Sequence, residues 1–399
     1  MKKPKSILFV LQSTFTAGGA FRSFKLLLEG FSGDSSFTVR VIVFSPEKNL
    51  VQELEDLEDV EVISLDHLPF GILGRFLDGW PLGSGMQAFS KLSFDVVLSV
   101  FSIKKLQEQI TKCNPDIVYA NSSIFRPSML WANQGLEKKP AVFIHLRENA
   151  QFADGIIRYV FNKIFEALSR LSYICISETI REKVEKFTEN KAYLVYNPIS
   201  VSSAPKPSPV NGIKQSKIKV LFAGGFQPNK GLAEFLLFLN SLSFCNTQVE
   251  LMVVGGAGPK KYTNRCDELI GKLSDKITVV NAKTVDNIDK WIATSSFCVV
   301  WHTHPHFSRF IVEAQLIGKT VLTKSDILIE EHKQLSPMFI CDIVPQDYWG
   351  TTFENVFATI QRIGDISEKK ILDQTFEKTF SADHHVAQVK KILENKIQG

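Results

Sequence analysis

The stretch Ile218–Gly231, IKVLFAGGFQPNKG, decides the fold of the second half of the chain. It opens with a mostly apolar run, which is typical of a strand buried on both faces of a parallel sheet. Gly224 and Gly225 follow, and after Lys230 an apolar helical pattern covers Leu232–Leu242. A strand, a glycine turn and a helix in this order predict the first β-α unit of a doubly wound α/β domain.

Short apolar runs alternate with helical patterns along both halves of the chain. In the first half the predicted strands are Ser6–Leu11, Phe37–Phe44, Val60–Ser64, Asp116–Ala120, Ala141–His145, Ser172–Ile176 and Tyr193–Tyr196, and the helices are Phe21–Phe31 and Ile156–Leu171. After Ile218–Ala223 the predicted strands are Val249–Val254, Ile277–Val280, Phe297–Val300, Thr320–Thr323 and Phe339–Cys341, and further helices cover Lys261–Lys272, Val285–Thr294, Arg309–Ile317 and Asp383–Lys396. Each half therefore predicts one Rossmann-like, doubly wound α/β domain.

A stretch rich in proline and serine separates the two halves. Ser200–Lys217 contains three prolines and five serines and has no large aromatic residue, which is typical of a linker. We place the linker at residues 204–217, between a first domain of residues 1–203 and a second domain of residues 218–380. Two such domains in tandem are expected to face a cleft.

The composition limits the class of protein. The 399 residues carry a net charge of +4, with 44% hydrophobic and 22% charged residues. These values exclude wholesale disorder, and the charge is too small to argue for nucleic-acid binding. No apolar run approaches the roughly 18 residues of a membrane-spanning helix. The six cysteines form no C-x-x-C pair, which indicates buried free thiols in a reducing compartment, so we expect a cytoplasmic protein.

Glycines and polar residues follow the predicted strands of the first half, at the edge where open α/β sheets bind ligands. Gly18 and Gly19 lie between the first strand and the first helix, where the backbone can approach a ligand, although an ordinary flexible loop fits equally well. His145 ends a strand, and Arg147 and Glu148 follow it. A lone histidine there is usually structural, but three polar groups together look like a site. The polar residues at matching strand ends are Asn121, Ser122, Ser123 and Asn197.

Two charged residues stand out in the second half. Lys230 lies at the mouth of a helix, after the Gly224 turn, where its ammonium can meet a phosphate; a solvated lysine is the alternative. Glu313 lies in the middle of a predicted helix. A carboxylate there can accept two hydrogen bonds from a vicinal diol such as a ribose. The alternative is that Glu313 is an ordinary, partly exposed helix residue without a ligand.

Three histidines alternate in the loop after Phe297–Val300. His302, His304 and His306 would share one side of an extended segment and could ligate zinc. Pro305 and the absence of a nearby fourth ligand argue against a metal. We expect hydrogen-bonding histidines and no metal.

An ordered set of motifs covers nearly the whole chain. Its members are Gly18-Gly19-Ala20, the strand from Asp116 to Asn121, the strand ending in His145, Ile174–Ser177, Asn197-Pro198-Ile199, Gly224–Gly231 and Phe307–Val321. This set resembles the GT-B glycosyltransferases, and among them the large retaining "group 1" family, also called family four. The resemblance implies a GT-B fold, with a C-terminal helix over residues 381–399 that crosses back to the first domain.

The resemblance also implies roles for individual residues. Lys230 would bind the diphosphate of the donor, Glu313 would hold the ribose hydroxyls, and His145 would contact the donor sugar near the reacting carbon. The backbone around Asn281–Val285 would face the base. His145 and Glu313 are expected to take part in catalysis. The residues expected to bind the donor are Gly18, Gly19, Gly224, Lys230, Ser308, Arg309, Glu313 and Asn197. The residues expected to bind the acceptor are Asn121, Ser122, Arg147 and Glu148.

The sequence departs from the family pattern at three positions. Gly225 stands where the family has an arginine, Pro305 replaces the first glutamate of a pair, and Ser308 replaces a glycine. We expect Arg309 to supply the missing positive charge. The chain contains no Asp-x-Asp, so we expect neither a metal nor another cofactor. Helix N-termini and Lys230 would then stabilise the leaving diphosphate.

The predicted function is transfer of a sugar from a nucleotide-sugar donor to a glycan or lipid-linked glycan acceptor, in cell-surface polysaccharide or lipopolysaccharide biosynthesis. The apolar segment Leu68–Gly85 would either rest on the inner face of the cytoplasmic membrane or pack on its own domain. We expect no nucleic-acid partner. The alternatives are a non-catalytic GT-B protein that binds a glycan or a partner, and a GT-B sugar-nucleotide epimerase or phosphorylase.

Overall fold

The protein is described by a computed structural model over residues 4–11, 19–66, 103–126, 128–129, 136, 138–147, 171–199, 217–282, 285, 287–305, 307–326, 330–335, 340–368 and 374–398. The chain divides into two compact units. The first comprises Met1–Pro198 and Thr379–Gly399, and the second comprises Ile199–Lys378.

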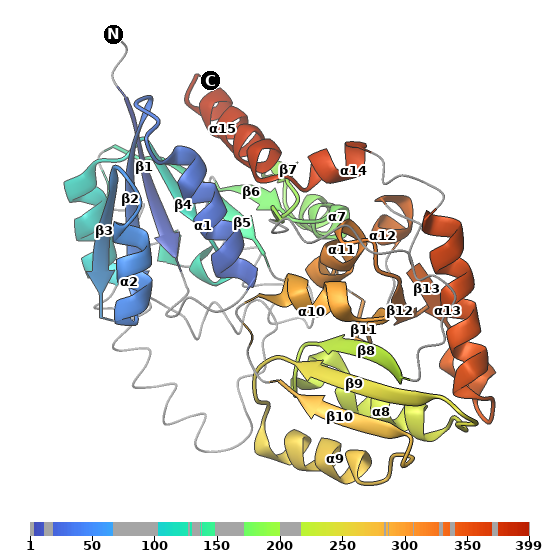
Figure 1. The fold of residues 1–399 in the computed structure, drawn as a ribbon. Coiled ribbons are helices and arrows are strands. Elements are labelled where there is room, and N and C mark those ends of the chain that lie inside the picture. Colours follow the sequence, from blue (N-terminus) through green and yellow to red (C-terminus); the bar gives the residue numbers. More distant parts are fainter. Residues whose placement is uncertain are drawn as a thin grey trace. The chain divides into compact units, whose positions relative to one another are not determined.

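The first unit is built on a parallel sheet that has seven strands among the described residues, in the order β3-β2-β1-β4-β5-β6-β7 (Figure 1). The strands are β1 (Lys5–Leu11), β2 (Phe37–Phe44), β3 (Val60–Leu65), β4 (Ile117–Ala120), β5 (Ala141–Leu146), β6 (Leu171–Cys175) and β7 (Ala192–Leu194). The connecting elements include α1 (Gly19–Phe31), α2 (Lys48–Glu55), the 3-10 turn η1 (Ser123–Phe125) and α7 (Glu178–Phe187).

The central strand β1 is buried on both faces. Leu8 and Val10 pack into one hydrophobic cluster, and Ile7, Phe9 and Leu11 pack into the other. Because successive side chains of a strand point to opposite faces, this division explains why β1 reads as a continuous apolar run and not as an alternating one.

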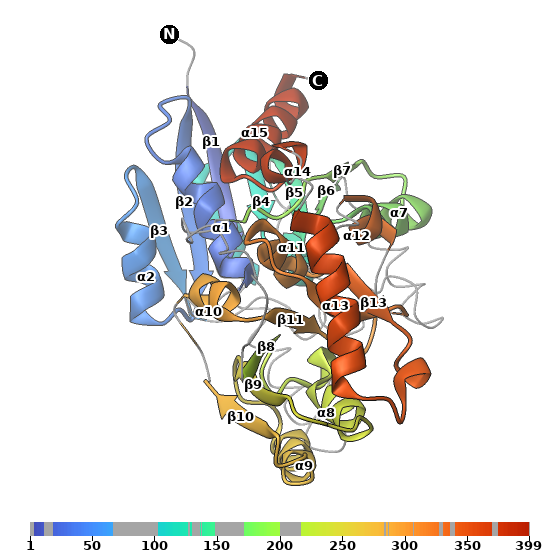
Figure 2. The same ribbon diagram turned by 45° about the vertical axis from the view of Figure 1, so that its right-hand side comes forward.

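The C-terminal helix α15 (Ala382–Gln398) belongs to the first unit, as the sequence predicts. It packs against α1 (Figure 2). Val389 and Leu393 of α15 are fully buried, one helical turn apart, in the cluster that also holds Phe9. A Cβ atom built on Gly30 of α1 would lie 2.4 Å from Cγ2 of Val386, so the two helices approach closely at this glycine.

The second unit has the same architecture, a parallel sheet with connecting helices. Its described strands form one parallel sheet in the order β10-β9-β8-β11-β12-β13. The strands are β8 (Lys217–Ala223), β9 (Gln248–Val254), β10 (Ile277–Asn281), β11 (Phe297–Val300), β12 (Val321–Lys324) and β13 (Ile340–Ile343). The helices are α8 (Leu232–Asn240), α9 (Lys260–Ile270), α10 (Ile288–Thr294), α11 (Arg309–Leu316), α12 (Glu330–Leu335), α13 (Phe353–Glu368) and α14 (Gln374–Thr379), with 3-10 turns η2 (Pro228–Lys230) and η3 (Pro345–Tyr348).

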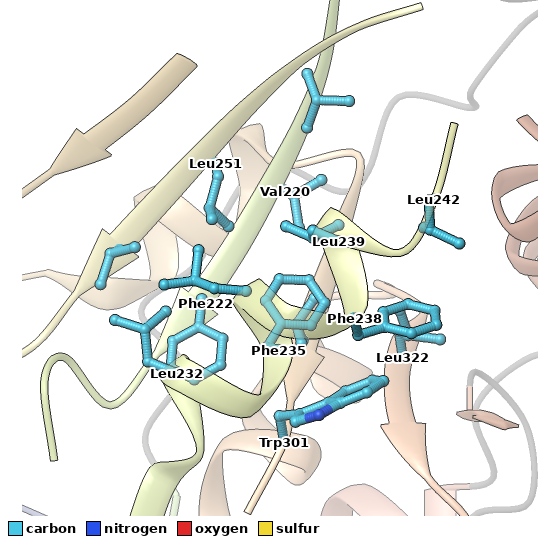
Figure 3. Close-up of a cluster of buried hydrophobic side chains, with 14 of the residues drawn as sticks. Val220, Phe222, Leu232, Phe235, Phe238, Leu239, Leu242, Leu251, Trp301 and Leu322 are labelled. Atoms are coloured by element: carbon cyan, nitrogen blue, oxygen red, sulfur yellow. The ribbon is translucent and has the colours of Figure 1, made fainter. Parts of the chain in front are cut away.

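Aromatic side chains hold α8 to this sheet. Phe235 and Phe238 of α8 pack on the Trp301 ring, with centroids 5.2 and 5.1 Å away (Figure 3). Phe222 of β8 stacks on Phe235 at 5.8 Å. Trp301 directly follows β11 and is 1% exposed, so this cluster also anchors the chain where it leaves the strand.

The two doubly wound sheets confirm the predicted architecture, and most strands begin and end within a residue or two of the predicted positions. Some elements differ. Leu171 begins β6 and does not end a helix, β7 is shorter than Tyr193–Tyr196, and α10 begins at Ile288 and not at Val285. The helices α2, α7, α12, α13 and α14 were not predicted. Cys245 is exposed, contrary to the expectation of buried thiols, and Cys113 is partly exposed.

Several predicted segments lie outside the described residues. These are Leu68–Gly85, the helix Ile156–Leu171 apart from its last residue, and the linker apart from Lys217, which begins β8. Among the helices that the structure describes, none combines the length and the apolar character needed to cross a membrane.

Candidate functional site

The strand orders place a topological switch point in each unit. Neighbouring strands lead away in opposite directions from β1 and β4 in the first unit, and from β8 and β11 in the second. Ligands of open α/β sheets bind outside the carboxyl ends of the strands at such points. The residues after β1 and β4, and those after β8 and β11, are therefore the candidates, and β5 lies directly beside β4.

The turn after β8 depends on close contact between two glycine pairs. Gly224 and Gly225 both donate their N–H groups to the Val254 carbonyl, at 2.8 and 2.9 Å. Gly225 has a φ of +57°, and a Cβ there would lie 2.4 Å from the Gly256 oxygen and 2.6 Å from the Gly255 carbonyl carbon. The position where the resembled family has an arginine thus has no space for a side chain.

Gly224, predicted to contact the donor, has a structural role in this turn. Its N–H is already bonded to Val254, so it is not directed at a ligand. A Cβ on Gly224 would lie 2.7 Å from Cγ of Lys230. The glycine therefore makes room for the aliphatic part of the Lys230 side chain and helps to set its position.

Lys230 carries a partly buried positive charge at this strand edge. Its Nζ lies 3.5 Å from Nε2 of His302, which is 4% exposed. Among the residues that the structure describes, no carboxylate forms an ion pair with Lys230, and burial lowers its pKa. A desolvated ammonium without an acidic partner is a ready binding group for an anion.

The start of α11 is occupied by a histidine that was not predicted as a site residue. The Ser308 N–H donates to Nε2 of His332 at 2.8 Å. The His332 ring stacks on Phe307, with centroids 4.3 Å apart, and burial lowers the pKa of His332 to about 4. A neutral His332 therefore takes up one of the N–H groups that a helix N-terminus can offer to an anion.

Arg309 forms an ion pair with Glu313, one helical turn further on. Nε of Arg309 lies 2.6 Å from Oε1 of Glu313, and the two side chains are 18% and 12% exposed. The structure thus brings together two of the predicted donor-binding residues. The arginine expected to supply a missing positive charge balances the carboxylate expected to hold the ribose.

The alternating histidines do not share one face. His302 is buried beside Lys230, whereas His304 is exposed and lies 3.4 Å from the Thr303 hydroxyl. His306 lies outside the described residues. Among those described, no group of three or more possible metal ligands comes together.

In the first unit His145 is fully buried at the end of β5. Its Nδ1 is hydrogen-bonded to the Tyr119 hydroxyl from β4. Its ring stacks on His385 of α15, with centroids 5.9 Å apart. Burial, with the nearby Arg147 charge, holds the pKa of His145 well below its usual range. No described residue contacts Nε2 of His145 by a hydrogen bond.

Two of the predicted acceptor residues, Arg147 and Asn121, contact each other. Nε of Arg147 donates to Oδ1 of Asn121 at 2.5 Å, and its Nη1 donates to Oδ1 of Asn197. Asn197, predicted on the donor side, thus belongs to the Arg147 cluster. Ser122 is buried and caps η1, accepting from the Ile124 N–H at 3.4 Å, which is a structural role.

Two predicted residues cannot be located: Gly18 and Glu148 lie outside the described residues, and Gly19 is the first residue of α1. Tyr119, His332 and His385 were not predicted as site residues. Tyr119 lies in the quoted strand motif, and His385 lies four residues before the buried Val389 of the predicted C-terminal helix. This helical spacing is the signal that could have placed His385 against the sheet.

No protein-family model matches the chain, and no curated protein matches it in sequence. Solved structures do match it. HepE from Anabaena in complex with UDP-glucose superposes with a TM-score of 0.66 and 16% identity, over 98% of this chain and 99% of that one. A glycosyltransferase from Rickettsia africae gives 0.65 and 17%, over 99% of both chains. Sucrose-phosphate synthase from Thermosynechococcus elongatus gives 0.67 and 14%, also over 99% of both. The chain therefore has the GT-B fold, as predicted.

Proposed function

We propose that this protein is a glycosyltransferase that moves a sugar from a nucleotide-sugar donor to a glycan or a lipid-linked glycan. The observation that carries the proposal is the Lys230 ammonium. It is partly buried at the switch point of the second sheet and forms no ion pair with any described carboxylate. In a GT-B fold, the diphosphate of a nucleotide sugar is an anion that fits this position.

The proposed reaction uses the Lys230 charge in the step where the sugar leaves. The bond between the anomeric carbon and the diphosphate oxygen breaks, and the diphosphate takes the electron pair. Lys230 stabilises the leaving group most strongly at this point, because negative charge accumulates on the leaving oxygen in a site of low dielectric. Glu313 would hold the ribose hydroxyls of the donor.

Retention of configuration is part of the proposal and rests on the family resemblance. The acceptor hydroxyl attacks the anomeric carbon from the face that the diphosphate leaves, and the departing phosphate oxygen takes its proton. His145 would face the donor sugar. We extend the proposal to cell-surface polysaccharide or lipopolysaccharide assembly at the inner face of the cytoplasmic membrane.

HepE, a structural neighbour, holds UDP-glucose, so UDP and UDP-glucose are the first ligands to test. The experiment is isothermal titration with UDP, GDP, ADP, CDP and dTDP without added metal. At about 100 times its Kd a ligand of the folded state adds about 2.7 kcal/mol of stability, so thermal shift provides a second readout. We expect one nucleotide to bind.

The test includes matched variants of buried and exposed residues. Lys230→Gln should weaken nucleotide binding about 10- to 100-fold, since hydrogen bonds to charged groups contribute about 1.5–3 kcal/mol. Lys219→Gln removes an exposed lysine from β8 and should change nothing. Equal affinity of wild type and Lys230→Gln would refute the assignment of the diphosphate site.

A second candidate, a non-catalytic GT-B protein, is favoured by the contacts at α11. Arg309 and Glu313 are paired with each other, and the Ser308 N–H is bonded to His332. The groups that were expected to bind the donor are therefore already bonded to residues of the same unit. Release of the nucleotide from UDP-sugars, with and without glycan acceptors, separates the two candidates. Tight binding with no turnover for any donor would favour the non-catalytic protein.

A further inference from the structure

We propose that Tyr119 and His385 are positioning residues for His145: Tyr119 fixes the tautomer that carries its hydrogen on Nε2, and His385 holds the ring plane, so that His145 presents an N–H donor to a substrate hydroxyl. The part of this proposal that concerns a substrate rests on the proposed glycosyl transfer. The tautomer itself does not depend on that function.

The strand register explains how Tyr119 reaches His145. Tyr119 of β4 pairs with Phe143 of β5, and His145 lies two residues further along β5. Residues two apart on a strand share a face, so the tyrosine and the histidine are diagonal neighbours on one face of the sheet. Phe9 of β1 packs on the Tyr119 ring, with centroids 5.1 Å apart. The tyrosine is therefore held on both sides.

The hydrogen-bond count decides the direction of the Tyr119–His145 bond. If the Tyr119 O–H donates to Nδ1, the one group of this pair without a described partner is the Nε2–H of His145. If Nδ1–H donates instead, both the tyrosine hydrogen and the Nε2 lone pair lack a described partner. Because each unsatisfied polar group in a buried position is unfavourable, the first arrangement is preferred.

The spacing along α15 explains how His385 reaches the same place. Val389 and Leu393 are fully buried in the cluster that contains Tyr119 and Phe143. His385 precedes them by one and two helical turns, so it extends the same face of the helix towards the carboxyl ends of the strands. Its Nδ1 donates to the Tyr196 carbonyl at 2.7 Å, which fixes the ring that stacks on His145.

The charges around the two rings favour the neutral forms. Burial lowers the pKa of His385 to about 3, with contributions from Arg147 and His384. Burial, Arg147 and His385 lower the pKa of His145. A neutral histidine with hydrogen on Nε2 can donate a hydrogen bond to a hydroxyl oxygen, but it is a poor proton acceptor at that atom. The arrangement therefore fits recognition of a hydroxyl and not proton abstraction.

The tautomer is tested on the full chain without any ligand. The protein is labelled with 15N-histidine, and the two ring nitrogens of His145 are identified by comparison with His145→Gln. We expect a bare Nδ1 and a protonated Nε2 that do not change between pH 6.5 and pH 8, because burial and the Arg147 charge hold the pKa of His145 well below its ordinary value. In Tyr119→Phe the preference for this tautomer should be lost. A protonated Nδ1 in the wild type, or the same pattern in Tyr119→Phe, would overturn the proposal.

Three further variants separate positioning from folding. Tyr193→Phe removes a hydroxyl from β7, where the ring packs in the same cluster without contacting His145, and should leave the His145 signals unchanged. His385→Phe keeps an aromatic ring at the stacking position, whereas His385→Ala removes it. Restoration of the His145 signals by phenylalanine but not by alanine supports the stacking role, and equal behaviour of the two variants contradicts it.

Kinetics then test the substrate contact. With a donor identified, Tyr119→Phe should lower kcat/KM about fivefold to tenfold, as expected for loss of one oriented hydrogen bond, while the Kd for the free nucleoside diphosphate stays the same. An unchanged kcat/KM would refute the hydroxyl contact. If the wild type shows no transfer, the proposed function fails, and the ligand-free spectra still decide whether Tyr119 fixes the tautomer.

Discussion

Replacing Gly225 with alanine should destabilise the second unit far more than the same change at other glycines. The new Cβ would lie 2.4 Å from the Gly256 oxygen, with a backbone φ of +57°. Placing a non-glycine residue in the left-handed region costs about 1–2 kcal/mol, and the backbone shift needed to relieve such an overlap costs about 1–3 kcal/mol more. We expect a total loss of about 2–5 kcal/mol.

Two other glycines of the same unit separate these contributions. Gly350 has a φ of +76° and no atom within 4 Å of the place that an added Cβ would take, and Gly256 has open space and no positive φ. Gly350→Ala should therefore show only the backbone strain, about 1–2 kcal/mol, and Gly256→Ala should be close to neutral. Of these three variants, only Gly225→Ala combines strain with overlap.

The assay is urea unfolding followed by tryptophan fluorescence, because Trp301 is buried in the unit that contains Gly225. Thermal unfolding gives an independent value. At about 2–4 °C per kcal/mol for a domain of this size, Gly225→Ala should lower the melting temperature by about 5–15 °C. If Gly225→Ala loses no more stability than Gly350→Ala, the close approach of the two glycine pairs does not explain the missing arginine.

Two further predictions concern pH and stability. Glu354 accepts the N–H groups of Cys245, Asn246 and Thr247 at 3.2–3.3 Å. Burial raises the pKa of Glu354, but hydrogen bonds, including those from Thr247 and Asn246, outweigh it and lower the pKa. Glu354→Gln should cost about 1 kcal/mol at pH 7, and this difference should disappear as pH falls through the lowered pKa. Urea midpoints measure it, with Glu268→Gln as the exposed control. Burial lowers the pKa of His332 from its ordinary 6.5 to about 4 in the folded state. The contribution of the neutral histidine to stability is therefore complete above pH 6.5 and is lost as pH falls towards 4. His332→Gln should flatten the dependence of stability on pH over this range, and an unchanged slope would contradict the neutral His332–Ser308 bond.

Most strands could be predicted from the sequence because they are short apolar runs bounded by polar residues or glycine, and the central ones are buried on both faces. Phe297–Val300 is found at its predicted bounds. The helix α13 was missed although Phe353, Val356 and Ile360 repeat at helical spacing and are all buried. The signal was present there, and a longer window over this part of the chain would have detected it.

The site could be predicted only in part, since its geometry depends on contacts between distant segments. Lys230 and Glu313 were predicted as site residues from their positions at a helix mouth and in motifs, and the structure places Lys230 partly buried after β8 and Glu313 buried in α11. Glu313 forms an ion pair with Arg309, one helical turn away. From the sequence alone, Arg309 was expected to bind the donor. His332 lies 24 residues from Ser308, and no local sequence pattern predicts a hydrogen bond between them. Contacts of this kind follow from the packing of elements, which periodicity does not encode.

On the proposed function, each sheet carries one characteristic group whose charge state suits one kind of ligand oxygen. At the second sheet the characteristic group is the cation Lys230, whose charge suits a diphosphate. At the first sheet His145 is kept uncharged by burial and by the neighbouring Arg147, so its Nε2–H suits the neutral oxygen of a hydroxyl. A charged histidine at this position would favour an anion over a neutral hydroxyl. The buried Tyr119–His145–His385 arrangement would therefore select a neutral hydroxyl at the first sheet, which gives a reason for keeping this histidine neutral.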